Sequence, residues 1–334
     1  MAQPLPQDLP EIFNASVKSL EIKLAYSKVL EIEQDANSEQ DLVRARVIGY
    51  LIREGPSMRA SEYVAEEVIS CENREQLYKI GEMFIHHFIR AFKRIRRYVP
   101  TPSCNSSCSS FEPEKEQIRD IPCKNLFRNA KETALLRDGN QCLVTGRYDF
   151  EKEYPNKRTR LTHTKCTYIF PPSINMNISG ANDNKCEYGT SFWAIMKCFG
   201  YEDIPKKLMG DGIHTLDNVM TLSLDMHAFF NSLFVWFEAV DGEENMYNIV
   251  AVHPGCLHDC EANPTTFTIQ NPKYPLPNPE YLRIHAACCR VAQLSGATEY
   301  IENTCNYLDD IGVMSQDGSS AHALMFALQP LAQK

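Results

Sequence analysis

The chain has 334 residues, of which 43% are hydrophobic and 10% aromatic. This apolar content is ample for a packed core and excludes global disorder. The net charge of −9, with a pI near 5.6, argues against a protein that coats nucleic acid through bulk positive charge.

The first residues, "MAQPLPQDLPEIFNAS", contain no basic segment followed by an apolar run, so we expect no signal peptide. Nor does any apolar stretch approach the roughly 18 residues that cross a bilayer, so we expect no contact with membranes. The 13 cysteines are then expected to be mostly free thiols in a reducing compartment, which predicts an intracellular protein, cytoplasmic or nuclear.

Residues 1–98 are predicted to form an N-terminal helical region, with helix throughout 15–98. Ser38, three residues before Asp41, resembles a helix N-cap, and Gly55 is a plausible end of the same helix. Asn73 is expected to begin the longest helix, "NREQLYKIGEMFIHHFIRAFKRIRRY". The cations at its end complement the helix dipole, or contact phosphates or an acidic partner.

The composition then changes twice along the chain. Residues 99–122 are rich in serine, proline and charge without periodicity, which predicts a linker or surface loop. Within 123–334, "CLVTGRYDF" and "LTHTKCTYIF" are expected to be strands, and a helix is expected around "TSFWAIMKCFGYEDI". Residues 218–240 should begin as a strand and become helical or extended, and a later helix should end at Gly296. The fold class is therefore α+β.

Two groups of residues resemble a known family. "LLRDGNQCLVTGRYD" is followed by a strand ending "CTYIFPP" and then by Asn218 and His227, which are separated by eight residues. This order resembles the HNH endonuclease domain of fungal HNH-domain proteins, from about residue 130 to the C-terminus. The resemblance implies an HNH-like ββα-metal core, flanked by C-terminal helices, in which two strands and a helix hold one divalent cation such as Mg²⁺ or Mn²⁺.

In that family the first motif histidine is the general base, the asparagine orients it and tethers the loop, and the last histidine ligates the metal. Asn218 and His227 match the asparagine and the last histidine, but the first histidine falls on Tyr168. Tyrosine, with a pKa near 10 rather than about 6.5, is a poor base at neutral pH. Because Thr167 is also a weak ligand, His227 would hold a metal poorly by itself.

Three nearby side chains are supporting candidates. His163 lies five positions before Tyr168 and faces away from it on a regular strand, unless a bulge intervenes. His214 precedes Asn218 by four residues, and Asp225 precedes His227 by two. Each of the three can equally be solvated or structural. Asn218 can be a loop-stabilising side chain, and His227 a core histidine.

The segment "NKRTRLTHTK" places four cations before this strand. They form a candidate site for nucleic-acid phosphates or for an anionic small molecule, or else an ordinary solvated loop. The four residues are Lys157, Arg158, Arg160 and Lys165.

Three functions are consistent with these observations. The favoured hypothesis is an HNH-fold protein that has lost conventional nuclease activity and acts on a small organic substrate, for example in fungal secondary metabolism. In it Tyr168 supplies acid/base chemistry with His227 or Asn218. The alternatives are a divalent-metal endonuclease and an inactive pseudo-nuclease that binds nucleic acid or a protein.

Overall fold

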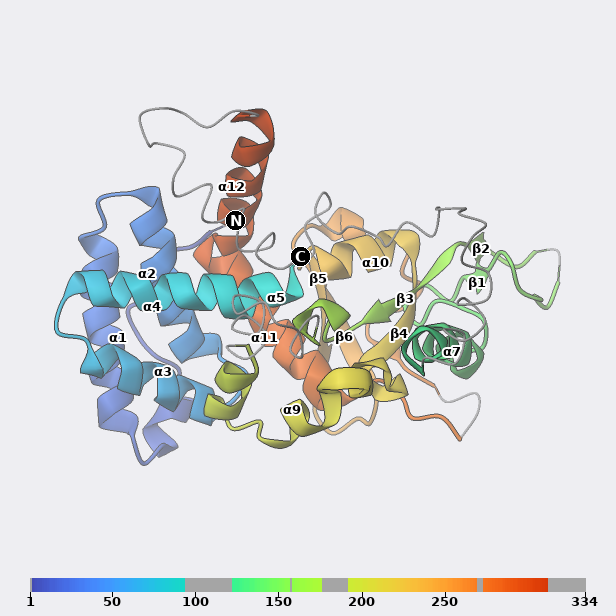
Figure 1. Cartoon of the computed structure of the whole chain (residues 1–334), viewed down its shortest axis with the longest axis horizontal. Coiled ribbons are helices and arrows are strands. Elements are labelled where there is room, and N and C mark those ends of the chain that lie inside the picture. The colour runs from blue at the N-terminus through green and yellow to red at the C-terminus, as the bar shows by residue number, and fades with distance from the viewer. Residues whose placement is uncertain (1, 94–121, 157, 176–191, 269–272, 312–334) are drawn as a thin grey trace, which may run out of the picture.

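A computed structural model describes residues 2–93, 122–156, 158–175, 192–268 and 273–311, and shows a mixed architecture of helices and small sheets (Figure 1). Several predicted features lie outside these residues: the cations Arg94, Arg96, Arg97 and Lys157, and the predicted linker 99–122 except for its last residue. Among the helices of the described ranges, none is both long and apolar enough to cross a membrane.

The N-terminal region is helical, as the sequence predicts. The Ser38 hydroxyl accepts a hydrogen bond from the Asp41 N–H at 3.1 Å, and Asn73 caps its helix through the Gln76 N–H at 3.0 Å. After α4 the chain continues through a π-helical turn, Ile85–Ile89, into α5. The helices of this region are α1 (Ser19–Gln34), α2 (Glu39–Glu54), α3 (Met58–Ser70), α4 (Arg74–Phe84) and α5 (Arg90–Phe92).

These helices share one hydrophobic core with the rest of the protein. The Ser57 hydroxyl donates to the Phe199 carbonyl at 2.7 Å, and the Tyr201 hydroxyl donates to the Pro56 carbonyl at 2.7 Å. Helix α11 (Pro279–Ser295) packs against both α2 and strand β5 (Val235–Ala239), and it runs between the two halves of the molecule in Figure 1. The helical region is therefore one layer of a larger fold.

The strands within the described residues form three small sheets. In the first, β1 pairs with β2 in parallel; in the second, β3 pairs antiparallel with β4, from Thr164 opposite Ser223 to Tyr168 opposite Val219. The third is antiparallel, in the order β5-β6-β7. The remaining strands are β1 (Tyr148–Asp149), β2 (Leu161–Thr162), β3 (Thr164–Tyr168), β4 (Val219–Ser223), β6 (Met246–Ala251) and β7 (Thr265–Thr266).

The expectation of a strand over "CLVTGRYDF" is largely wrong, because only Tyr148–Asp149 is a strand. The preceding residues form turns that need left-handed backbone, with φ of 59° at Asn140 and 63° at Gly146. The Gly146 N–H donates to the Cys142 carbonyl at 3.0 Å, and this bond closes one of the turns. The turn-forming residues Asn140 and Gly146 therefore decide the local structure, and the apolar pattern does not.

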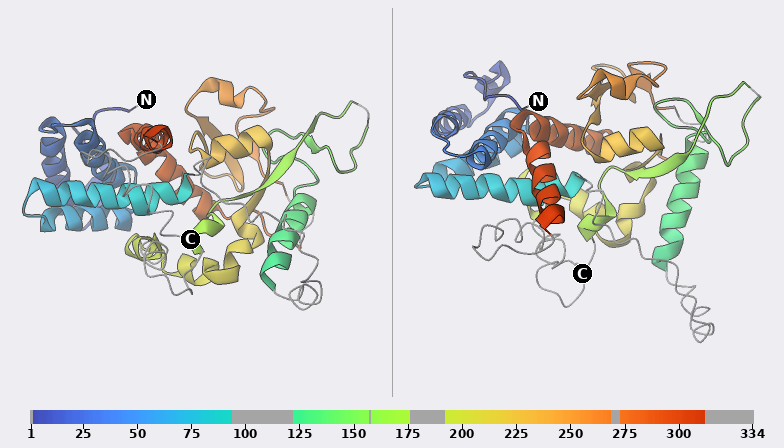
Figure 2. Two further views of the ribbon diagram at one scale, coloured as in Figure 1. Left: turned by 45° about the horizontal axis from the view of Figure 1, so that its top comes forward. Right: turned by 90° about the horizontal axis from the view of Figure 1, so that it is seen from above.

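Strand β4 leads directly into α10 (Leu224–Asn231), which the Ser223 hydroxyl caps through the Met226 N–H at 3.4 Å. Of the two expected outcomes near His227, helical or extended, the segment adopts the helical one. Helix α10 and helix α7 (Pro122–Arg137) pack on the β3–β4 pair and lie on opposite sides of β3 in both views of Figure 2.

The other described helices complete the fold. Helix α11 ends at Gly296, which takes the left-handed conformation with φ 83°, as predicted. Residues 192–198 are helical and occupy the position of the helix expected around "TSFWAIMKCFGYEDI". The last two are α9 (Asp203–Leu208) and α12 (Ala297–Ile311).

Candidate active site

The Tyr168 hydroxyl lies 2.8 Å from Nδ1 of His214. Tyr168 ends β3, is 8% exposed, and packs against Ala134 of α7 and its cross-strand neighbour Val219. Burial raises the pKa of Tyr168 well above its ordinary range, because a phenolate loses its hydration there. The phenol is therefore protonated at every pH near neutrality.

His214 is the more exposed member of this pair. It ends a short helical turn, Gly210–His214, and is half-buried. Burial lowers the pKa of His214, although Asp211 acts in the opposite direction. The imidazole is thus neutral at pH 7. Since a phenol is a good donor and a neutral imidazole nitrogen a good acceptor, we assign the resting hydrogen bond as Tyr168 O–H donating to Nδ1.

His227 belongs to a different group, on the other face of β3. Its Nδ1 lies 2.8 Å from the Thr167 hydroxyl, and its Nε2 lies 3.0 Å from the Asn231 side-chain amide. A neutral imidazole has one N–H, so the ring uses one nitrogen as acceptor and the other as donor. The Asn231 side-chain nitrogen donates to Nε2, and Nδ1–H then donates to the Thr167 hydroxyl oxygen.

The expected partnership of Tyr168 with His227 or Asn218 therefore needs correction. Successive side chains of a strand point to opposite faces, so Thr167 faces α10 and His227 whereas Tyr168 faces α7. The histidine that the Tyr168 hydroxyl contacts is His214. Period-two alternation also explains why Thr167, and not Tyr168, reaches the histidine of α10.

Asn218 is fully buried and bonds only to backbone groups in the described structure. Its Oδ1 accepts from the Phe170 N–H at 2.9 Å, and its Nδ2 donates to the carbonyls of Phe170 (3.0 Å) and Ile213 (2.8 Å). It therefore joins the end of β3 to the turn that carries His214. Asn218 thus fixes the backbone segments that carry Tyr168 and His214. Because it is fully buried, it is a positioning residue that cannot contact a substrate.

Arg137 and Asp138, from the "RDG" of the sequence motif, secure the same loop. The Arg137 guanidinium is fully buried and donates to the carbonyls of Leu216 (2.6 Å) and Val219 (2.8 Å). The Asp138 carboxylate accepts from Arg137 and from the Thr221 N–H at 2.9 Å. Sequence reasoning gave these two residues no role, although an adjacent Arg–Asp pair in a predicted core segment signals a buried ion pair.

The other supporting candidates lie outside both groups. His163 is exposed and its ring lies beside Phe150, with ring centroids 5.5 Å apart. Asp225 is exposed in the first turn of α10. Asn231 was not among the candidates, yet it contacts His227; the signal was its position four residues later on the same helix face.

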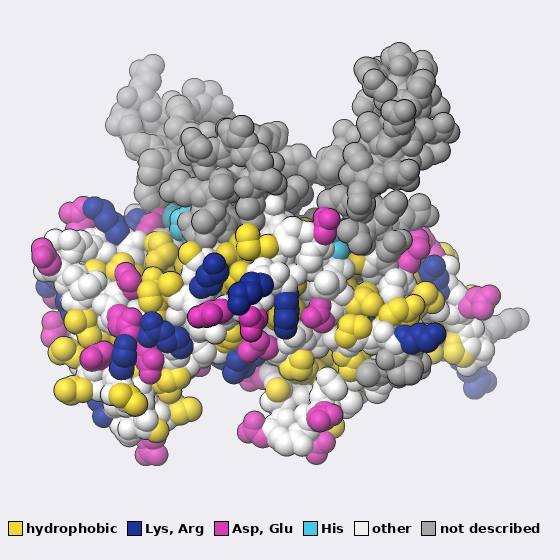
Figure 3. Space-filling view, turned by 60° about the horizontal axis from the view of Figure 1, so that its bottom comes forward, with side chains coloured by type: hydrophobic (Ala, Val, Ile, Leu, Met, Phe, Trp, Pro, Cys, Tyr) yellow, Lys and Arg dark blue, Asp and Glu magenta, His cyan; other side chains and the backbone are white. Residues whose placement is uncertain are grey.

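The side chains of the described members of the predicted basic cluster form no hydrogen bond or ion pair with either group. Arg160 pairs with Glu261 across the surface, and the exposed Arg158 and Lys165 lie on a loop and on β3. On the face seen in Figure 3, basic side chains alternate with acidic ones instead of forming a continuous basic surface. These positions fit solvated residues better than a phosphate-binding track.

The residues at the His227 group do not fit the divalent cation that the HNH resemblance implies. Mg²⁺ and Mn²⁺ prefer carboxylate oxygens, whereas this group offers one imidazole, one hydroxyl and one amide. Across the described residues no group of three or more His, Cys, Asp or Glu side chains is arranged to hold a metal ion. No hydrolytic step through a metal follows from this donor set.

Comparisons with known proteins give no relative: no family model matches the chain, and neither a curated protein nor a solved structure does.

Proposed function

We propose that this protein is an HNH-like scaffold turned from phosphodiester hydrolysis to proton transfer on a small organic substrate. The supporting topology is the antiparallel β3–β4 pair followed at once by α10, with Asn218 tethering the loop as the resemblance implies. The observation that carries the proposal is the 2.8 Å contact between the Tyr168 hydroxyl and His214 Nδ1.

In this proposal His214 is the catalytic residue and Tyr168 its positioning partner. Catalysis uses the other neutral tautomer of His214, in which Nδ1 carries the proton and Nε2 is the basic nitrogen that takes a proton from an acidic C–H or O–H of the substrate. The imidazolium so formed donates its Nδ1–H to the Tyr168 oxygen, which stabilises it, and Nε2–H returns the proton to a second substrate atom. Tyr168 stays protonated throughout, which is what its raised pKa favours.

The proposal predicts catalysed hydrogen exchange at carbon. Small enolisable ketones and β-keto acids, incubated with the protein in D₂O and followed by ¹H NMR, should lose their α-proton signals. His214→Gln should slow this by about 10²-fold or more, the usual contribution of a general base. Tyr168→Phe should slow it less, because the imidazolium then loses only the oxygen that accepts from its Nδ1–H.

His227→Gln is the matched control, because His227 lies on the other face of β3 and should leave the exchange unchanged. Absence of exchange across the panel, or exchange that survives His214→Gln, would contradict the proposal. Metal-dependent nicking of plasmid DNA that His227→Ala abolishes would support the hydrolytic alternative instead.

A further inference from the structure

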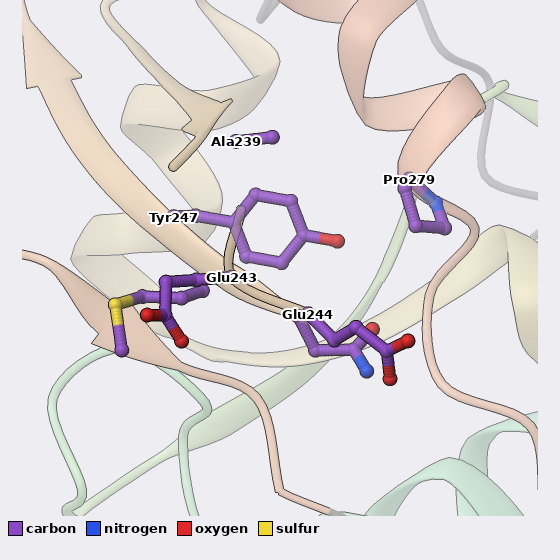
Figure 4. A pocket seen from close by; sticks show the side chains of 7 residues that line it. Ala239, Glu243, Glu244, Tyr247 and Pro279 are labelled. Atoms are coloured by element: carbon purple, nitrogen blue, oxygen red, sulfur yellow. The ribbon is translucent and has the colours of Figure 1, made fainter. Parts of the chain in front are cut away.

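A cavity of about 310 Å³ lies between the β5–β6 turn and the start of α11, and shares no residue with the Tyr168–His214 pair. Its apolar walls are Ala239, Met246 and Pro279, together with the ring of Tyr247 (Figure 4). The volume is at the lower end of the range for sites that bind small molecules.

Tyr247 is the unusual group of this cavity. It is 2% exposed, and its hydroxyl has no hydrogen-bond partner in the described structure. Burial raises the pKa of Tyr247 to about 12, so the phenol is neutral. Figure 4 shows the hydroxyl directed into the space between Glu244 and Pro279. Buried hydroxyls in native proteins almost always have a partner, so this one indicates a missing polar group.

The acidic residues at the cavity mouth indicate whether the missing polar group is a cation or an anion. Glu243 and Glu244 are both exposed in the β5–β6 turn, and neither carboxylate forms an ion pair within the described ranges. Pro279, the first residue of α11, has no N–H and so removes one of the donors with which a helix start binds anions. The site therefore favours a cation.

We propose that this cavity binds a small organic cation, namely a primary ammonium group on an apolar body. The ammonium donates to the Glu244 carboxylate and to the unpaired Tyr247 oxygen, while Glu243 adds negative charge at the cavity mouth. The apolar body packs against the walls, which a hydrated metal ion would not use. Glu244 is exposed, so its side chain can rotate to admit the ligand. The inference is independent of the proposed proton-transfer function.

Titration with benzylammonium, followed by protein NMR at low ionic strength, tests this site, with benzyl alcohol and benzoate as neutral and anionic analogues. We expect benzylammonium to bind at least about tenfold more tightly than either analogue, since charge-assisted hydrogen bonds form only with the cation. Tyr247→Phe and Glu244→Gln should each weaken binding by about tenfold, whereas Glu72→Gln, an exposed carboxylate between α3 and α4, should not.

Thermal unfolding of Tyr247→Phe separates a binding defect from a folding defect. Because the hydroxyl has no partner to lose, the variant should unfold at the same temperature as the natural protein or higher. No detectable binding of benzylammonium, equal binding of benzyl alcohol, or binding that Tyr247→Phe leaves unchanged would each overturn the proposal.

Discussion

Replacing Arg137 with glutamine is expected to lower the free energy of unfolding by about 3–5 kcal/mol. The guanidinium makes five hydrogen bonds, two to Asp138 and three to the carbonyls of Leu216, Val219 and Pro275. Glutamine cannot reach this set of acceptors, so the Asp138 carboxylate would remain buried without its cation. Arg137→Lys should restore little of this stability, because a single ammonium group cannot reach all the acceptors that the planar guanidinium bonds.

Urea unfolding of Arg137→Gln and Arg137→Lys checks this expectation. Arg74→Gln is the matched control, because Arg74 is 59% exposed where it pairs with Asp35. A surface pair of that kind contributes at most about 1 kcal/mol. If Arg137→Gln cost no more than Arg74→Gln, the buried pair would not be what secures the loop between His214 and β4.

Acid is expected to destabilise the protein through His285. This side chain is 1% exposed, and its ring stacks on Phe230 with centroids 3.8 Å apart. Burial lowers the pKa of His285 to about 3, against a weaker opposing hydrogen bond to the Phe230 backbone. In the unfolded chain His285 therefore becomes protonated near pH 6.5, whereas in the folded chain it stays neutral until about pH 3.

The sign follows from linkage. Between pH 6.5 and 3 the unfolded state holds more protons, so stability falls as the pH falls, by up to roughly 5 kcal/mol at the lower limit. Denaturant unfolding across this window should show a shallower slope for His285→Gln than for the natural protein. His258→Gln is the matched control for the loss of a histidine, because its side chain is 75% exposed. Parallel slopes for His285→Gln and the natural protein would contradict the burial of a neutral imidazole.

Local signals predicted the local structure well. Ser38, Asn73 and Gly296 cap helices where the sequence placed them, because a cap depends on side chains a few residues apart. His163 also lies away from Tyr168, as expected, although β3 begins only at Thr164 and the His163 ring packs beside Phe150. The strand expected over residues 142–150 failed because Asn140 and Gly146 require left-handed backbone, which an apolar pattern does not reveal.

The candidate site could not be assembled from the sequence, because its contacts join distant segments. His214 lies 46 residues from Tyr168, and only the packing of β3 against β4 and α7 brings them together. The motif spacing predicted Asn218 and His227 as site residues, but spacing alone does not say on which face of β3 each group lies. That depends on the pairing register, in which Tyr168 lies opposite Val219.

The pairing of Tyr168 with His214 is the central claim, and the most direct test is an NMR titration of the histidine ring nitrogens. We predict that the pKa of His214 lies below 6.5, and that Nδ1 is the unprotonated nitrogen at neutral pH. Tyr168→Phe should shift the Nδ1 resonance, because the ring loses its hydrogen-bond donor, while His227→Gln should not. A His214 with an ordinary pKa, or an Nδ1 resonance that Tyr168→Phe leaves unchanged, would contradict the account.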